Sequence, residues 1–241
     1  MTFYDDGFYA FEDKTGMDSA RVIVPLILQL GSFKSVLDVG CGVGGWLKVF
    51  SEQGVLDFVG VDGPWIRNQK LMIPKMQTLT HDLQEPLMLN RTFDLVVSLE
   101  VAEHLPYKKA ETFVNSLVTH GDIILFSAAI PGQVGTHHVN KQWPSFWAEI
   151  FDKHGFVVVD CLRREIWDNQ QVAFWYAQNI MFFIKKTQLD KYPKLQGHYA
   201  GEKKKQLNIV HPILLEYILN TNVSLFGSVK LFLKALKNKL K

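Results

Sequence analysis

The sequence predicts a doubly wound α/β domain in which a mainly parallel sheet is covered by helices on both faces. Short, almost continuous apolar segments alternate along the chain with segments of helical periodicity, as is typical of strands buried on both faces. In addition, the first apolar segment, 35–39, runs into a loop with four glycines and then into a helical segment. A strand, a glycine-rich loop and a helix in this order are typical of nucleotide-binding α/β domains.

The expected elements define three regions of the chain. The first region, 1–34, is predicted to be a cap or lid with a helix that starts near Asp18, which suits an N-cap, and stops at Gly31. The second, 35–187, is the predicted catalytic domain. Its predicted strands are 35–39, 57–61, 76–80, 93–99, 122–127, 156–161 and 179–184, and its predicted helices are 45–53, 108–119 and 144–154.

The third region, 188–241, differs in composition from the rest. Residues 185–241 carry 12 lysines against three acidic residues, a net charge of +9, whereas residues 1–184 carry −7. We interpret 188–206 as a basic linker and the apolar stripe within 225–240 as an amphipathic helix edged with lysines. That helix either lies on an anionic surface, such as the inner face of a membrane, or packs back on the domain with its lysines in water.

Composition narrows the class of protein. Hydrophobic residues make up 47% of the 241 residues and charged residues 21%, which supports a packed core. The two cysteines, Cys41 and Cys161, form no disulfide framework, the N-terminus lacks a signal-peptide pattern, and no apolar segment is long enough to cross a membrane. These features predict a cytoplasmic protein.

Acidic residues around the glycine loop narrow the expected ligand. Asp38 precedes the glycines by two residues, where a carboxylate suits a cationic group and would repel a pyrophosphate. Asp62 ends the second expected strand, a position that suits the two hydroxyls of a ribose. Asp82 follows the third strand and can accept a hydrogen bond from an adenine amino group.

With these motifs in order, the chain resembles class I S-adenosylmethionine-dependent methyltransferases over residues 35–185. The matching segments are VLDVGCGVG, GVDG, HDL and FDLVVSLEVAEHL, and 127–151 looks like a subfamily of small bacterial methyltransferases. The resemblance implies a Rossmann-like sheet of seven strands, the last antiparallel. It also implies S-adenosylmethionine as cofactor. The cofactor contacts that we expect are Asp38, Gly40, Gly42, Gly44, Asp62, Asp82, Leu83 and Glu100.

Two later segments supply candidates for the reaction itself. Glu100, Glu103 and His104 follow the fourth strand, and His137 and His138 follow the fifth. Neighbouring parallel strands present their ends to one crevice, so these side chains are expected to converge. Glu100, Glu103, His104 and His138 could hold Mg²⁺ or Mn²⁺.

Other interpretations of these residues stay open. The pattern E-x-x-E-H with a distal histidine resembles metal-dependent 2′-O-methyltransferases of small RNAs, and E-x-x-E-H also resembles O-methyltransferases of the ubiquinone pathway. A metal-free site with His137 or His138 as base fits equally well. In a third interpretation His104 is structural. Trp143 and Trp147, four residues apart, are expected either to line the acceptor pocket or to pack in the core.

The acceptor predicted from these observations is a small molecule, with a sugar or glycan hydroxyl favoured. The alternatives are a metal-dependent RNA 2′-O-methyltransferase and a non-catalytic cofactor-binding module. The net negative charge of residues 1–184 argues against a nucleic-acid partner, because phosphate contacts need a basic face. The basic tail leaves peripheral membrane contact open, and the sequence predicts no particular oligomeric state.

Overall fold

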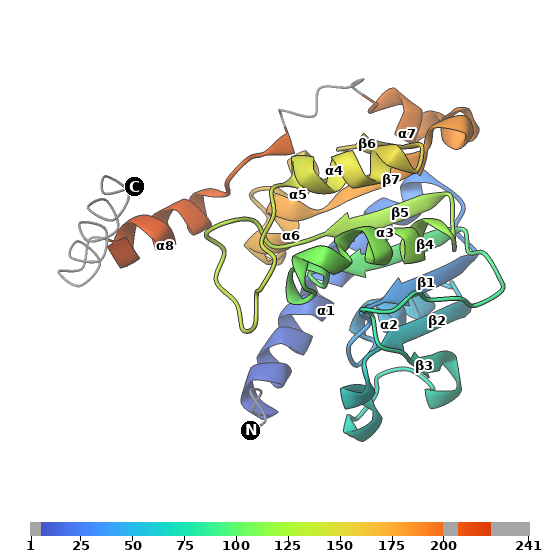
Figure 1. The fold of residues 1–241 in the computed structure, drawn as a ribbon, viewed down its shortest axis with the longest axis horizontal. Helices are drawn as coiled ribbons and strands as arrows, with labels where there is room; N and C mark the ends of the chain where they lie inside the picture. The colour runs from blue at the N-terminus through green and yellow to red at the C-terminus, as the bar shows by residue number, and fades with distance from the viewer. Residues whose placement is uncertain (1–5, 200–206, 223–241) are drawn as a thin grey trace.

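A computed structural model describes residues 6–199 and 207–222 and shows a seven-stranded sheet between two layers of helices (Figure 1). The strand order is β3-β2-β1-β4-β5-β7-β6. β7 runs antiparallel to both of its neighbours, and the other pairings are parallel. The predicted fold class, including the antiparallel last strand, is confirmed.

The strands begin and end close to the predicted positions. They are β1 Ser35–Val39, β2 Asp57–Asp62, β3 Thr78–Thr80, β4 Leu95–Leu99, β5 Ile123–Ser127, β6 Phe156–Val159 and β7 Met181–Lys185. The α-helices are α1 Asp6–Leu30, α2 Gly45–Glu52, α3 Ala110–Val118, α4 Pro144–Lys153, α5 Leu162–Ile166, α6 Phe174–Asn179, α7 Pro193–Gly197 and α8 Pro212–Asn222. Sequence periodicity did not predict α5 to α8, most of which are too short for an apolar repeat.

Successive residues of a strand pack alternately into two hydrophobic cores, one on each face of the sheet. On β5, Ile123 and Leu125 join α1, α2 and α5 on one face, whereas Ile124 and Phe126 join α3 and α4 on the other. β7 divides its residues in the same way. Because the strands are apolar on both faces, they must lie between two helix layers. This burial fixes the register and places the carboxyl ends of β1, β2, β4 and β5 along one edge.

The N-terminal helix is longer than predicted. α1 starts at Asp6, so Asp18 lies inside the helix, where it pairs with Arg21 at 3.1 Å, and the predicted N-cap is wrong. Ser19 is buried and its hydroxyl accepts a hydrogen bond from the Ala173 amide at 3.0 Å. This contact ties the helix to the segment that precedes α6.

Part of the predicted linker is folded. Residues 186–191 form a 3₁₀ helix and 193–197 form α7, with Leu189 and Leu195 buried in the core beside α1. Apolar residues spaced six apart give no helical stripe, which is why composition alone suggested a linker. The predicted amphipathic stripe lies mostly at 225–240, outside the described residues. None of the described helices is both long and apolar enough to span a membrane.

Candidate active site

The glycine loop at the end of β1 requires glycine for two different reasons. Gly40 and Gly44 both have φ of +89°, a left-handed conformation that favours glycine. A Cβ on Gly40 would lie 2.2 Å from Val101 Cγ2, and one on Gly44 would lie 2.5 Å from Ile73 Cγ1. The loop therefore packs against neighbouring side chains so closely that only bare backbone fits.

Asp62 fastens this loop to the end of β2. Its Oδ2 accepts from the Gly42 amide at 2.7 Å, and its Oδ1 accepts from the Gly63 amide at 2.6 Å and from Trp65 Nε1 at 3.0 Å. Burial raises the pKa of Asp62, and these donors act in the opposite direction. Three of the roughly four lone-pair sites of the carboxylate are thus occupied, and the remaining one, on Oδ2, can accept from a ligand hydroxyl.

Asp38 faces the same loop from within β1. Its side chain is buried, and burial, with a smaller contribution from the Asp62 charge, raises its pKa to about 8. A buried carboxyl in this state gains from a cationic ligand, which would favour its charged form.

Two hollows open along the carboxyl edge of the sheet. The larger, about 450 Å³, is lined by Asp62, Trp65, Asp82 and Leu83 among others. The smaller, about 240 Å³, is lined by Asp38, Gln133 and Tyr176 and by Gly16 and Met17 of α1. The two hollows share five lining residues, namely Gly40, Gly42, Glu100, His104 and His138. They therefore meet where the reaction residues were predicted.

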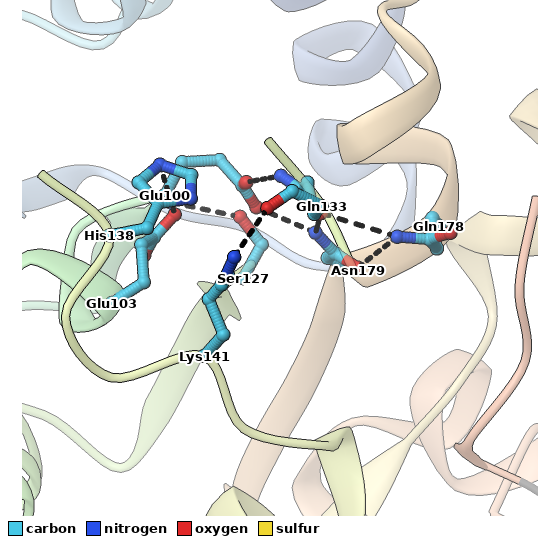
Figure 2. Close-up of polar contacts among 8 residues, drawn as sticks. All are labelled: Glu100, Glu103, Ser127, Gln133, His138, Lys141, Gln178 and Asn179. Atoms are coloured by element: carbon cyan, nitrogen blue, oxygen red, sulfur yellow. Dashed lines mark hydrogen bonds and ion pairs between the residues drawn. The ribbon is translucent and has the colours of Figure 1, made fainter. Parts of the chain in front are cut away.

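Glu100 is held at this junction by neutral hydrogen-bond donors (Figure 2). Its Oε2 accepts from Gln133 Nε2 at 2.8 Å and its Oε1 from Asn179 Nδ2 at 3.1 Å. Its φ of +55° is unusual for a side chain with a Cβ, and its amide donates to the Ser127 carbonyl and hydroxyl. A strained backbone fixed by a neighbouring strand is typical of a functional position.

Glu103, His104 and His138 come together beside Glu100. One potential ligand atom from each lies within 4.8 Å of the others, and His138 Nε2 is 3.9 Å from Glu103 Oε1. Glu103 is fully buried, and among the described residues neither of its carboxylate oxygens has a hydrogen-bond partner. Burial, followed by the Glu100 charge, raises the pKa of Glu103 well above its usual value.

The two histidines of this cluster are neutral at physiological pH. Burial lowers the pKa of His138 to about 4, with smaller contributions from His104 and Lys141. Burial also lowers the pKa of His104. Their rings meet edge to face with centroids 4.9 Å apart. A neutral imidazole can accept a proton or bind a metal ion.

The structure does not bring together every predicted reaction residue. His137 is exposed with φ of +59° and lines neither hollow, so its geometry does not favour the expected role as base. Glu100 is not part of the three-residue cluster, and its two oxygens instead accept hydrogen bonds from Gln133 and Asn179. Of the four expected metal ligands, Glu103, His104 and His138 converge.

The aromatic residues divide between core and site. Trp147 is buried against Phe126, so the core-packing alternative is the one that holds for it, and Trp143 lines neither hollow, so these two residues form no aromatic wall. Trp46, Trp175 and Tyr176 line the smaller hollow instead. Sequence reasoning missed Trp65, Gln133, Gln178 and Asn179. The last two are polar residues directly before an apolar strand, which was the available signal.

Comparisons with known proteins bear on the class of protein and on its fold. A family model described as a methyltransferase domain matches residues 18–128, from α1 to the end of β5. A protein of Invertebrate iridescent virus 6 named "Putative methyltransferase 235L" is 25% identical over 224 residues, which cover 85% of this chain and 80% of that protein. The match thus extends beyond the region that the family model covers.

Solved structures share the fold. The methyltransferase domain of bacterial CtHen1-C is 18% identical with a TM-score of 0.52, over 69% of this chain and 97% of that domain. The methyltransferase domain of bacterial CtHen1-CN is 18% identical with a TM-score of 0.50, over 69% of this chain and 97% of that domain. The fold, the glycine loop and the family match over residues 18–128 support a class I S-adenosylmethionine-dependent methyltransferase. The protein is therefore an enzyme of the transferase class.

Proposed function

We propose that this methyltransferase methylates a hydroxyl group of a small uncharged acceptor, with sugar and glycan hydroxyls as the favoured class. The observation that carries the proposal is the junction of the two hollows. The larger hollow would take the adenosine of S-adenosylmethionine between Asp62 and Asp82. The smaller one would take the methionine part beside Asp38 and the acceptor beyond it. The transferable methyl group would then lie near Glu100, His104 and His138.

The chemistry at this junction suits a hydroxyl acceptor. The methyl carbon moves from the sulfonium to the acceptor oxygen, so that the carbon–sulfur bond breaks as the carbon–oxygen bond forms. Without a bound metal ion, the hydroxyl proton passes to His138 as the carbon–oxygen bond forms, and His138, whose pKa burial lowers to about 4, then releases it to water. Glu100 and the glycine loop would hold the two reactants in line.

The three-residue cluster also fits a divalent metal ion. The two carboxylate oxygens of Glu103 and Nδ1 of His138 are buried without hydrogen-bond partners among the described residues, which a bound cation would relieve. Glu103, His104 and His138 would hold Mn²⁺ or Mg²⁺, and two imidazole ligands favour Mn²⁺ of the two. When bound, such an ion would polarise the acceptor hydroxyl and lower its pKa.

The charge of the site supports a small uncharged acceptor over RNA. Neither hollow is lined by a lysine or arginine from the described residues. The hollows therefore offer no side-chain cation for the phosphates of an RNA substrate. The convergence of Glu103, His104 and His138 is the observation that keeps a metal-dependent RNA 2′-O-methyltransferase as the second candidate.

Calorimetric titration with S-adenosylhomocysteine tests the cofactor site first. We expect micromolar affinity for the wild type and a loss of about 1–3 kcal/mol for Asp62→Ala. Unchanged affinity in Asp62→Ala would remove this residue from the site, and an absence of binding by the wild type would favour the non-catalytic alternative. Repeating the titration with Mn²⁺ and after chelation tests the metal.

An acceptor screen then separates the two candidate functions. Methyl release from S-adenosylmethionine would be followed with free sugars, glycosides and a small RNA duplex as acceptors. Turnover of a sugar that His138→Ala lowers, without loss of S-adenosylhomocysteine affinity, would support the proposal. Methylation of RNA, with salt-sensitive RNA binding by the full chain, would replace it with the second candidate.

A further inference from the structure

A buried network of amide side chains connects the reaction centre to the C-terminal segment, residues 207–222. Beyond Glu100, the Gln133 Oε1 accepts from Asn179 Nδ2 at 3.0 Å and from Gln178 Nε2 at 3.3 Å (Figure 2). Gln178 also donates to Asn179 Oδ1 at 3.0 Å. Gln133, Gln178 and Asn179 are each at most 4% exposed, so water does not compete for these bonds.

The network ends on the backbone of the C-terminal segment. The Gln178 Oε1 accepts from the His211 amide at 2.8 Å, and Arg163 donates to the carbonyls of Gln178 and Leu207. Leu207, His211 and Leu214 are buried at this contact. A segment far along the chain from β4 is thus fastened two hydrogen bonds away from the Gln133 amide.

The same segment touches the loop that covers both hollows, residues 130–143. Val134, Gly135, Thr136 and His138 of this loop line one or both hollows. At the base of the loop, the site of a Cβ on Gly132 lies 2.8 Å from Ile218 Cδ1 of α8. Lys141 Nζ, from the other end of the loop, donates to the Gln133 carbonyl at 3.1 Å.

We propose that Gln178 is a positioning residue for methyl transfer. Its side chain uses the docked C-terminal segment to orient Gln133, and Gln133 in turn holds Glu100 and loop 130–143 against the reaction centre. Gln178 lines neither hollow, so it acts only through its neighbours. Its place in methyl transfer rests on the function proposed above, whereas the physical link between segment and loop does not.

Hydrogen–deuterium exchange of the full chain tests the link without an acceptor. Gln178→Met keeps the volume and removes the hydrogen bonds. We expect amides of loop 130–143 and of residues 207–222 to exchange at least about tenfold faster, while β4 and β5 stay unchanged. Gln133→Met should accelerate the loop alone, because it leaves the bond from His211 to Gln178 intact.

Asn208→Ala is the matched control. Asn208 fastens the same segment to Ser145 through two hydrogen bonds of 3.0 and 2.9 Å, but it lies outside the amide network. It should loosen its own neighbourhood and leave loop 130–143 unchanged. Equal exchange of the loop in wild type and Gln178→Met would overturn the proposal, as would acceleration of the loop by Asn208→Ala.

Cofactor titration separates positioning from a general loss of structure. The affinity of Gln178→Met for S-adenosylhomocysteine should stay within about threefold of wild type. With any acceptor that the wild type methylates, kcat should fall at least about tenfold while KM for S-adenosylmethionine is retained. Loss of cofactor affinity in Gln178→Met would mean that the residue maintains the fold and would overturn the positioning role. Failure of the wild type to bind the cofactor would instead count against the proposed function.

Discussion

The two halves of the proposed site, the cofactor half around the glycine loop and the acceptor half around Glu100, are held in place by different means. Around the glycine loop, backbone contacts fix the geometry. Gly40 and Gly44 pack where no Cβ fits, and Asp62 accepts hydrogen bonds from the Gly42 and Gly63 amides. Around Glu100, side-chain contacts fix the geometry. The side-chain amides of Gln133 and Asn179 each donate a hydrogen bond to one of its carboxylate oxygens. The backbone geometry of the glycine loop tolerates few substitutions, whereas the hydrogen bonds of a side-chain network change with each substitution.

This difference fits what each half has to recognise. The cofactor is the same throughout the enzyme class, so a loop built from close backbone contacts suits it. Acceptors differ among enzymes of one fold, and the loops and side chains after β4 and β5 can change without disturbing the sheet. Such a side-chain arrangement can destabilise the fold. Glu103 is an example, since it is fully buried with no hydrogen-bond partner for its carboxylate among the described residues.

The largest expected effect is in the backbone-built half. Gly40→Ala combines a left-handed φ of +89° with a Cβ 2.2 Å from Val101, so we expect a loss of about 2–5 kcal/mol in unfolding free energy and no detectable cofactor binding. Gly54→Ala is the control, because its φ is +93° but no atom lies within 4 Å of the new Cβ. It should cost about 1–2 kcal/mol. Equal costs in urea unfolding would show that the clash does not matter.

The same contrast explains what could be predicted from the sequence. A strand, a glycine loop and ordered acidic residues form a local pattern, so the fold, the loop and Asp62 were predictable from the order of motifs. The network of Gln133, Gln178 and Asn179 joins residues that are far apart in sequence. Their side chains carry no periodicity, and only the fold shows that they meet. Trp65 lies only three residues after Asp62, but no motif indicates that its indole N–H reaches the carboxylate.

In the acceptor half, replacing Glu103 should stabilise the protein without metal. Its pKa is raised, so the folded state binds the proton more tightly than the unfolded state, and wild-type stability falls as the pH rises above about 4.5. Glu103→Gln removes the part of this decline that Glu103 causes, whereas the raised pKa values of Asp38 and Asp62 still contribute in both proteins. In the presence of a chelator we expect the variant to be more stable than wild type at pH 8 by about 1–3 kcal/mol, and similar at pH 5. A variant less stable than wild type at both pH values would contradict the assignment.

Position 135 tests whether the cluster depends on loop geometry. A Cβ on Gly135 would lie 2.1 Å from His138 Cε1 and Nε2, so Gly135→Ala must displace the imidazole. If Glu103, His104 and His138 bind Mn²⁺, we expect its affinity to fall about 10- to 100-fold, with cofactor affinity unchanged. Calorimetry with Mn²⁺ measures this. Gly197→Ala, which meets no atom within 4 Å, is the control.

Loop 130–143 also shows where local sequence patterns were not enough. The paired histidines predicted a functional loop, yet they gave no means of choosing between His137 and His138. The choice follows from the backbone, because φ of +59° at His137 accompanies an exposed side chain, whereas His138 lies against His104 and Glu103. Neighbouring residues of one type can thus have unrelated environments, and only tertiary packing distinguishes them.

In the cofactor half, the effect expected from pH rather than from a substitution concerns Asp38. Asp38 has a pKa of about 8 in the free protein, so at pH 7 it is mostly protonated. If the cofactor ammonium pairs with the carboxylate, binding releases a proton, and affinity for S-adenosylhomocysteine should rise by up to about tenfold per pH unit between pH 6 and 8. Calorimetry in buffers of different ionisation enthalpy measures the released proton. Asp38→Asn should abolish that release, and a wild type that releases no proton at pH 7 would place the ammonium elsewhere in the smaller hollow.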